Sequence, residues 1–203
     1  MEQRTPEWFA ARCGQVTASR IADITAKIKS GASASRKNYL AQLLVERLTG
    51  LPAESYSNTA MEWGNEQEPL GRAAYELAGS VLVEECGYLP HPSITGTGAS
   101  PDGLVGTDGL LEIKCPNTAT AIEFILSASI PDRHQLQMQW QMACAGRLWC
   151  DYAVYDPRLP DYAQLTVQRV ARDASRIADI AKEIQQFLAE LDTLHTQFTR
   201  RYA

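Results

Sequence analysis

Hydrophobic residues recur every three or four positions over residues 173–199. The apolar positions are Ile177, Ile180, Ile184, Phe187, Leu188, Leu191, Leu194 and Phe198. On a helix, this spacing places them along one stripe, with polar residues on the opposite side. The pattern therefore predicts a long amphipathic helix that covers a core, and the same stripe could supply a subunit interface.

Two helices are expected near the N-terminus. Thr5 followed by Pro6 is a typical helix start, which predicts a helix over residues 6–12. A second, short helix should begin at Thr17 or Ser19. Further helices are expected over residues 36–49, 58–78, 117–126 and 131–146.

Short apolar runs between turn residues predict strands. Residues 103–105 and the apolar run that carries Glu112 flank the turn Gly106-Thr107-Asp108-Gly109, which predicts a β-hairpin. Other strands are expected at residues 81–83, 87–89, 149–155 and 164–170. Together these elements predict an α/β fold, with a mixed sheet of about five strands flanked by helices, in a single domain spanning residues 1–203.

The composition is typical of a soluble globular protein, with 45% hydrophobic and 21% charged residues. No apolar run reaches membrane-spanning length, and the first residues lack an apolar signal segment. We therefore expect an intracellular, cytoplasmic protein without a membrane partner. The five cysteines contain no Cys-x-x-Cys pair, which argues against a disulfide framework and against a zinc site.

The net charge of -5 argues against a protein that coats DNA by bulk electrostatics. Basic residues are nevertheless concentrated in the first quarter of the chain, where 8 Lys and Arg residues face 4 Asp and Glu residues, a balance of +4. The basic stretch over residues 27–37 fits either a mobile surface loop or, in a DNA enzyme, a contact with the DNA backbone or minor groove that becomes ordered on binding.

The hairpin also carries the clearest candidate chemistry. Asp102 stands at its start and Glu112 near its far end, so the chain reversal should bring the two carboxylates side by side. Because side chains alternate along a strand, Glu112 and Lys114 should point to one face and Ile113 to the other.

Two carboxylates, with the Ile113 carbonyl as a further oxygen, suit Mg²⁺ or Mn²⁺. Lys114 could position an attacking water and offset charge on a phosphate, which suggests hydrolysis of a phosphodiester. The alternative is ordinary surface chemistry, since Ser-Pro-Asp-Gly is a common turn and exposed Glu and Lys are common on strands.

Four separated segments resemble the motifs of phage lambda exonuclease and the related YqaJ-type viral recombinases, which are PD-(D/E)xK nucleases. The segments are Trp8-Phe-Ala-Ala-Arg-Cys-Gly-Gln-Val-Thr-Ala-Ser19, Trp63-Gly-Asn-Glu-Gln-Glu68, Ser100-Pro-Asp-Gly-Leu104 with Leu111-Glu-Ile-Lys-Cys-Pro116, and Gln135-Leu-Gln-Met-Gln-Trp140. Four motifs in the right order are far more specific than one. The resemblance implies a restriction-endonuclease-like core.

The resemblance also implies roles for residues of the active site. It implies two Mg²⁺ ions, with Mn²⁺ as a possible substitute, bridged by Asp102 and completed at one site by Glu112 and the Ile113 carbonyl. Glu68 would be an acidic residue near the metals, and Gln137 would reach the active site. Without the resemblance, Glu68 would be an ordinary solvent-facing helix glutamate.

The DNA contacts implied by the resemblance lie in other segments. Arg12, Ser19 and Ser100 would hold the 5′ phosphate, and Met61 stands where the family has an apolar wedge that splits the terminal base pair. The alternatives are a surface arginine, a capping serine and a core methionine. His134 could contact a DNA phosphate, but a histidine satisfied at a helix start is favoured.

The activity implied by this resemblance is a Mg²⁺-dependent 5′ to 3′ exonuclease that acts on double-stranded DNA ends and leaves 3′ overhangs. Members of this family form ring-shaped homotrimers and work beside a single-strand annealing protein in phage recombination, which would make the protein phage or prophage encoded. Two alternatives are a PD-(D/E)xK endonuclease and a catalytically inactive DNA-binding recombination scaffold.

Overall fold

The computed structural model describes residues 1–26, 31, 33–53 and 59–202. Within these residues, five strands form a mixed sheet in the order β2-β5-β6-β7-β8. They are β2 (Val83–Glu84), β5 (Gly103–Val105), β6 (Gly109–Lys114), β7 (Trp149–Tyr155) and β8 (Leu165–Ala171). β6 and β7 run parallel, and the other neighbouring strands run antiparallel. Both central strands are buried along most of their length, as expected when helices cover a sheet on both faces.

The β-hairpin predicted from the turn residues is present. β5 pairs with β6 so that Gly103 lies opposite Leu111 and Val105 lies opposite Gly109. Gly106 opens the turn with a φ of +54°, a left-handed conformation that glycine adopts without steric cost. Because this turn sets the register, the faces to which the β6 side chains point follow from it.

Helices cover the two faces of this sheet. α5 (Thr118–Ser127) and α6 (Asp132–Ala145) pack on one face, and α4 (Thr59–Gly79) packs on the other, where Tyr75 joins a cluster with Ile113. The buried apolar residues between β6, β7 and the first pair of helices are Leu110, Ala121, Phe124, Ile130, Met138, Met142, Cys150, Tyr152 and Val154. Both faces of the central sheet are therefore lined by apolar side chains.

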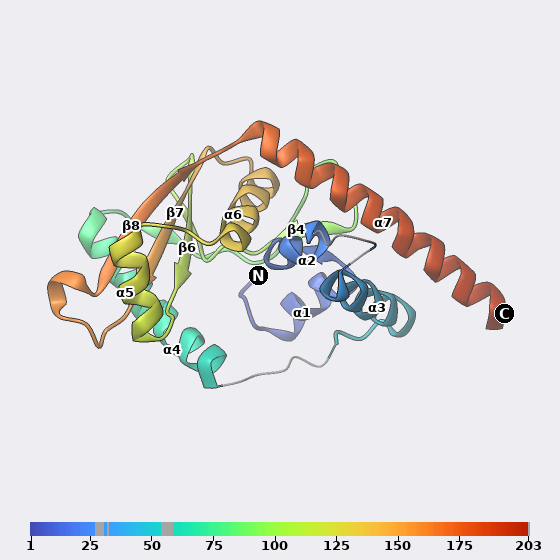
Figure 1. Cartoon of the computed structure of the whole chain (residues 1–203), viewed down its shortest axis with the longest axis horizontal. Coiled ribbons are helices and arrows are strands. Elements are labelled where there is room, and N and C mark those ends of the chain that lie inside the picture. Colours follow the sequence, from blue (N-terminus) through green and yellow to red (C-terminus); the bar gives the residue numbers. More distant parts are fainter. Residues whose placement is uncertain (27–30, 32, 54–58, 203) are drawn as a thin grey trace.

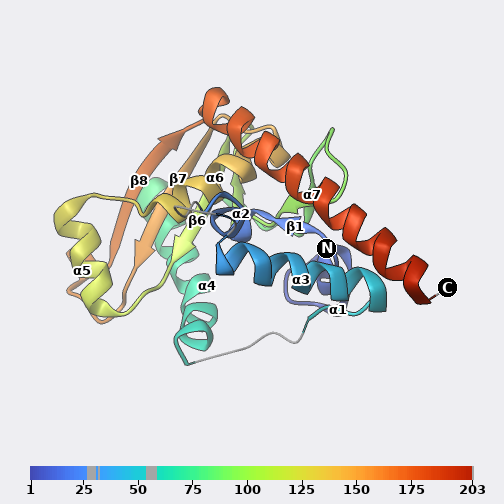
Figure 2. The same ribbon diagram turned by 45° about the vertical axis from the view of Figure 1, so that its right-hand side comes forward.

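The N-terminal segments and the C-terminal helix form a second body of helices beside the sheet (Figure 1). The elements are α1 (Pro6–Arg12), the 3-10 helix η1 (Ala18–Arg20), α2 (Ile21–Thr25), α3 (Ala34–Thr49) and α7 (Ala174–Tyr202). α7 starts beyond the end of β8 and runs along α2 and α3, with the C-terminus at its far end (Figure 2). Its apolar stripe from Ile177 to Leu191 is buried, which confirms the predicted helix and its core-covering face.

A separate three-stranded sheet is present among the described residues. It consists of β1 (Val16–Thr17), β4 (Thr97–Ala99) and β3 (Leu89–Pro90), in the order β1-β4-β3. The strand predicted at residues 87–89 was therefore wrongly assigned to the central sheet. β1 and β4 were not predicted at all, because strands of two or three residues leave no hydrophobic alternation to detect.

Most predicted helix ends lie within about three residues of those observed. α3 begins at Ala34 because Ser33 caps it, accepting a hydrogen bond from the Arg36 amide at 3.1 Å. The predicted start of α4 and much of the basic stretch, including Lys27 and Lys29, lie outside the described residues. In the part of the chain that the structure describes, no helix is both long enough and apolar enough to span a membrane.

Candidate active site

The hairpin brings Asp102 and Glu112 together. Asp102 immediately precedes β5, and its Oδ2 accepts a hydrogen bond of 2.7 Å from the backbone amide of Ile113 on β6. Since Ile113 points to the α4 face, its neighbours Glu112 and Lys114 point to the α6 face. Lys114 Nζ donates to Glu112 Oε1. The structure thus gathers the two acids and the lysine that the sequence analysis placed at one point.

Glu112 is held by α6 as well as by Lys114. Its side chain is only 1% exposed, and each carboxylate oxygen accepts a hydrogen bond of 2.6 Å from a glutamine: Oε1 from Gln137 and Oε2 from Gln141. Gln137 was expected at the site, but Gln141 was not. The available signal was its spacing, because residues four apart lie on the same side of a helix.

The alternating glutamines of α6 serve two different neighbours. Gln137 and Gln141 face Glu112, whereas Gln139 donates to the Ala171 carbonyl and accepts from the Asp173 amide, both at the junction of β8 and α7. This division follows from the helical period, which separates odd positions onto different faces.

The close approach of these groups changes their acidity. Burial, and then the negative charge of Glu112, raise the pKa of the Asp102 carboxyl well above its ordinary value. Burial by itself lowers the pKa of Lys114, but the charges of Glu112 and Asp102 outweigh it and raise that pKa above its usual range. Lys114 is therefore an ammonium ion beside two acids.

The donor set fits a hard divalent cation. Asp102, Glu112 and the Ile113 carbonyl offer oxygen ligands. A bound cation would offset the repulsion between the Asp102 carboxylate and the neighbouring acids. Among the described residues, no group of three or more His, Cys, Asp or Glu residues is arranged to hold a metal. Two carboxylates, completed by a carbonyl, water and substrate oxygens, match the coordination preferred by Mg²⁺.

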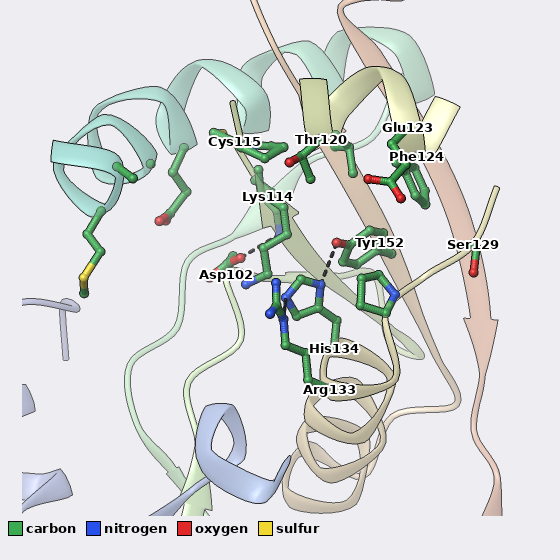
Figure 3. A pocket seen from close by; sticks show the side chains of 18 of the residues that line it. Asp102, Lys114, Cys115, Thr120, Glu123, Phe124, Ser129, Arg133, His134 and Tyr152 are labelled. Atoms are coloured by element: carbon green, nitrogen blue, oxygen red, sulfur yellow. Dashed lines mark hydrogen bonds between the residues drawn. The ribbon is translucent and has the colours of Figure 1, made fainter. Parts of the chain in front are cut away.

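These residues open into a cavity of about 810 Å³ bounded by α4, α5, β6 and the start of α6. Figure 3 shows Asp102 and Lys114 of the hairpin region, His134 of α6 and Tyr152 of β7 gathered around it, with Phe124 of α5 on the wall. Tyr152 lies on the strand next to β6, in register with Glu112. A cavity of this size admits a nucleotide-sized ligand.

His134 has partners for both ring nitrogens. Nε2 lies 3.1 Å from the Arg133 Nε–H, which donates to it, so Nδ1 carries the proton and donates to the Tyr152 hydroxyl at 2.7 Å. Burial, followed by the charges of Lys114 and Arg133, lowers the pKa of His134 to about 3. This is the satisfied histidine that the sequence analysis favoured, although its ring also lines the cavity.

Glu68 projects from α4 into the cavity wall, where it is partly buried. Its Oε2 pairs with Arg4 and its Oε1 with Arg72, whose Nη2 lies 3.3 Å away. Arg4 adopts a left-handed backbone with φ of +66°, a conformation that is uncommon for a residue other than glycine. Neither arginine was predicted as part of the site, and for Arg4, which is 64 positions away, no local pattern in the sequence signals the contact.

A neighbouring cavity of about 530 Å³ contains the expected phosphate anchor. Arg12 and Ser19 both line it, and Arg12 stacks 3.9 Å above the ring of Trp8. Ser100 accepts hydrogen bonds from Arg12 Nη1 at 3.2 Å and from Trp8 Nε1 at 3.0 Å. Met61 lines both this cavity and the one that contains Lys114, so it lies where the two adjoin.

Burial lowers the pKa of Arg12 from its ordinary value. A half-buried guanidinium that stacks on an aromatic ring is suited to bidentate binding of a phosphate. The role of Arg12 as a phosphate anchor stays a prediction.

Comparison with known proteins identifies the family. Residues 7–148, well over half of the chain, match the model of the YqaJ-like viral recombinase domain. The chain belongs to the YqaJ-like viral recombinase family. The matched region contains every residue that the sequence analysis assigned to the active site or to the phosphate anchor. No curated protein matches the chain.

Solved structures give the same relationship. LHK-Exo, an alkaline exonuclease from Laribacter hongkongensis, is 49% identical, with a TM-score of 0.92 and 98% of each chain covered. The same protein in complex with dAMP gives 50% identity, a TM-score of 0.92 and the same coverage.

A phage-related exonuclease from Haemophilus somnus 129PT is 15% identical, with a TM-score of 0.71 and coverage of 91% of this chain and 96% of that one, which shows likeness of fold alone. These similarities confirm the predicted α/β fold, a mixed sheet flanked by helices that is consistent with a restriction-endonuclease-like core.

Proposed function

We propose that this YqaJ-like protein is a Mg²⁺-dependent exodeoxyribonuclease that degrades one strand of duplex DNA from its end in the 5′ to 3′ direction. The observation that carries the proposal is the pair of adjoining cavities. One contains Asp102 and Lys114 with Glu112 behind them, and the other contains Arg12 and Ser19. An end phosphate and the next scissile phosphate of one strand require two such neighbouring sites.

Lys114 would act in the hydrolysis as a cation. Its ammonium lies beside both carboxylates and faces the cavity, where it would position the attacking water and offset charge developing on the phosphate oxygens. Asp102, Glu112 and the Ile113 carbonyl would hold two Mg²⁺ ions, or Mn²⁺ in their place. The ions would supply Lewis acidity and lower the pKa of bound water.

Gln137 and Glu68 would support this centre from α6 and α4. The Gln137 amide holds Glu112 Oε1 at 2.6 Å, which restricts the carboxylate to one orientation. Glu68 lies on the cavity wall and adds negative charge near Asp102, so it would orient water in the outer coordination layer.

The 5′ to 3′ direction of digestion would follow from binding of the 5′ phosphate. Arg12, Ser19 and Ser100 present a guanidinium and hydroxyl groups that suit a terminal 5′ phosphate. Met61, half-exposed between the cavities, would separate the terminal base pair so that one strand enters the anchor and its complement remains as a 3′ overhang.

The relatives support the same reading. LHK-Exo is an alkaline exonuclease and has a crystal structure in complex with dAMP. A deoxynucleoside monophosphate is the unit that an exonuclease releases. The family description, viral recombinase, supports a role in phage recombination. A homotrimeric ring around DNA and a single-strand annealing partner also belong to the proposal, and they rest on the family resemblance.

The decisive test uses linear duplex DNA labelled on one strand, with a 5′ phosphate or a 5′ hydroxyl, alongside covalently closed circles. We expect Mg²⁺-dependent nucleotide release that is fast from the phosphorylated end and slow from the hydroxyl end, with intact circles. Cut circles with defined fragments would favour the endonuclease. Absence of cleavage on every substrate, with DNA binding retained, would favour the inactive scaffold.

A further inference from the structure

Gln141 combines complete burial with a direct hydrogen bond to a candidate metal ligand. Its side chain is 0% exposed, and its Nε2 donates to Glu112 Oε2 at 2.6 Å. Gln137, one turn earlier, is only partly buried and donates to the other oxygen. Gln141 therefore cannot touch DNA or solvent, and any effect it has on the reaction must pass through Glu112.

The surroundings of Gln141 favour an apolar side chain. Its neighbours along α6, Trp140 and Met142, are completely buried, and Met138 one turn earlier is as well. The Gln141 Oε1 atom is buried and has no hydrogen-bond partner among the described residues. A buried polar atom without a partner is unfavourable, so packing alone does not account for a glutamine here.

The hydrogen bond to Glu112 accounts for the amide of Gln141 at this buried position. A carboxylate removed from water must receive hydrogen bonds or cations on both oxygens. Lys114 and Gln137 both act on Oε1, while Gln141 acts on Oε2. If the Lys114 ammonium moved to a substrate phosphate, the two glutamines would still give each carboxylate oxygen of Glu112 one donor.

We propose that Gln141 is a positioning residue for the proposed phosphodiester hydrolysis, one that acts by holding Glu112 in a fixed orientation toward the cavity. The inference rests on the proposed function of the site. The amide of Gln141 fixes Oε2 of the carboxylate, and that of Gln137 fixes Oε1. Such contacts behind a metal ligand commonly change metal affinity or activity by about 10–100-fold.

The test compares Gln141→Met with Gln139→Met, a matched control from the same helix. Gln139 is also buried, but its amide bonds Ala171 and Asp173 instead of the active site. Methionine keeps the length of the side chain and removes the donor. Four quantities are measured for each variant: single-turnover cleavage of 5′-phosphorylated duplex, DNA affinity in Ca²⁺, Mn²⁺ affinity of the DNA-free protein by electron paramagnetic resonance, and melting temperature.

For Gln141→Met we expect cleavage about 10–100-fold slower, partial recovery at high Mg²⁺, and Mn²⁺ binding about tenfold weaker. DNA affinity should be unchanged. The melting temperature should stay close to that of the wild type, because removal of the unpartnered Gln141 Oε1 offsets the loss of the donor to Glu112 Oε2. For Gln139→Met we expect the reverse, a lower melting temperature with the wild-type rate and Mn²⁺ affinity.

Wild-type cleavage and Mn²⁺ affinity in Gln141→Met would overturn the inference, as would a loss of rate that matches the loss of folded protein. If the methionine variant does not fold, Gln141→Asn keeps the amide but withdraws it by one methylene, and an intermediate loss is expected. Failure of the proposed function is distinguishable, because the wild-type protein would then cut closed circles or cleave no substrate. The comparison of Mn²⁺ affinity would still report on Glu112.

Discussion

The guanidinium of Arg12 donates a hydrogen bond to the hydroxyl of Ser100 across 3.2 Å, although the two residues lie 88 positions apart. Ser100 is separated from Asp102 by a single proline, whose rigid ring restricts the backbone between them. The contact therefore links the candidate phosphate anchor to the segment that carries the candidate metal ligand.

Replacing Arg12 should remove the preference for a 5′ phosphate. A hydrogen bond to a charged group contributes about 1.5–3 kcal/mol, so in Arg12→Gln the rate ratio between 5′-phosphorylated and 5′-hydroxyl duplexes should fall by about 10–100-fold. Arg12→Lys should recover only part of the ratio, because an ammonium lacks the planar fork. Arg201→Ala, at the exposed end of α7, is the control. An unchanged ratio in Arg12→Gln would place the end anchor elsewhere.

Lys114→Met should abolish most of the catalysis and leave DNA binding in place. Removal of one group that stabilises developing charge commonly costs about 10²–10³-fold in kcat. Single-turnover cleavage measures the loss, and DNA affinity in Ca²⁺, which commonly supports binding without cleavage, provides the comparison. Lys182→Met, on the exposed side of α7, should retain full activity. A Lys114→Met variant with normal kcat would exclude the proposed role of the ammonium.

Met61→Ala should slow digestion of blunt duplexes while digestion of ends that are already unpaired proceeds at the wild-type rate. A wedge offsets the cost of unstacking, which amounts to a few kcal/mol per step, so a reduction of about tenfold on blunt ends is expected. Leu126→Ala removes a more exposed apolar side chain from α5 and serves as the control. Equal slowing on paired and unpaired ends would instead indicate a general defect of the cavity.

Two glycine substitutions should change stability in opposite directions. An added Cβ at Gly64 in α4 meets nothing within 4 Å, so Gly64→Ala should stabilise the helix by about 0.5–1 kcal/mol. At Gly98, the same atom would lie 2.4 Å from Tyr88 Cζ and 2.5 Å from the Leu89 carbonyl, so Gly98→Ala should destabilise by about 1–3 kcal/mol or more. Urea unfolding measures both, and equal stabilities would contradict the packing of the small sheet.

His134 should make the protein less stable below neutral pH. Its pKa is about 3 in the folded protein and about 6.5 in an unfolded chain, so between these values the unfolded chain binds a proton that the native protein does not. Stability is therefore complete above pH 6.5 and falls as the pH decreases toward 3. Urea unfolding of the wild type and of His134→Gln at pH 7.5, 6 and 5 should show a smaller loss in the variant. The same loss in both proteins would exclude His134 as its source.

Much of the fold was predictable because it depends on local periodicity. The stripe from Ile177 to Leu191 specifies one helix face, and the turn at residues 106–109 specifies one register, whatever lies elsewhere in the chain. The small sheet escaped prediction because β1 and β4 are too short to carry a pattern, and because the strand predicted at residues 87–89 was assigned to the central sheet. Their pairing depends on contacts between segments about 80 residues apart, such as Val16 with Thr97.

The candidate site likewise has a part that local sequence predicts and a part that depends on tertiary packing. The sequence by itself determined the proximity of Asp102, Glu112 and Lys114, because a tight turn and the alternation of side chains along a strand place them within one hairpin. Only the tertiary structure decided that Gln141 holds the second oxygen of Glu112 and that Arg4 pairs with Glu68. Those contacts depend on how α6 packs against the hairpin and how the N-terminal segment packs against α4. Packing between distant segments depends on the complementary shape and charge of whole surfaces. A short stretch of sequence does not contain that information.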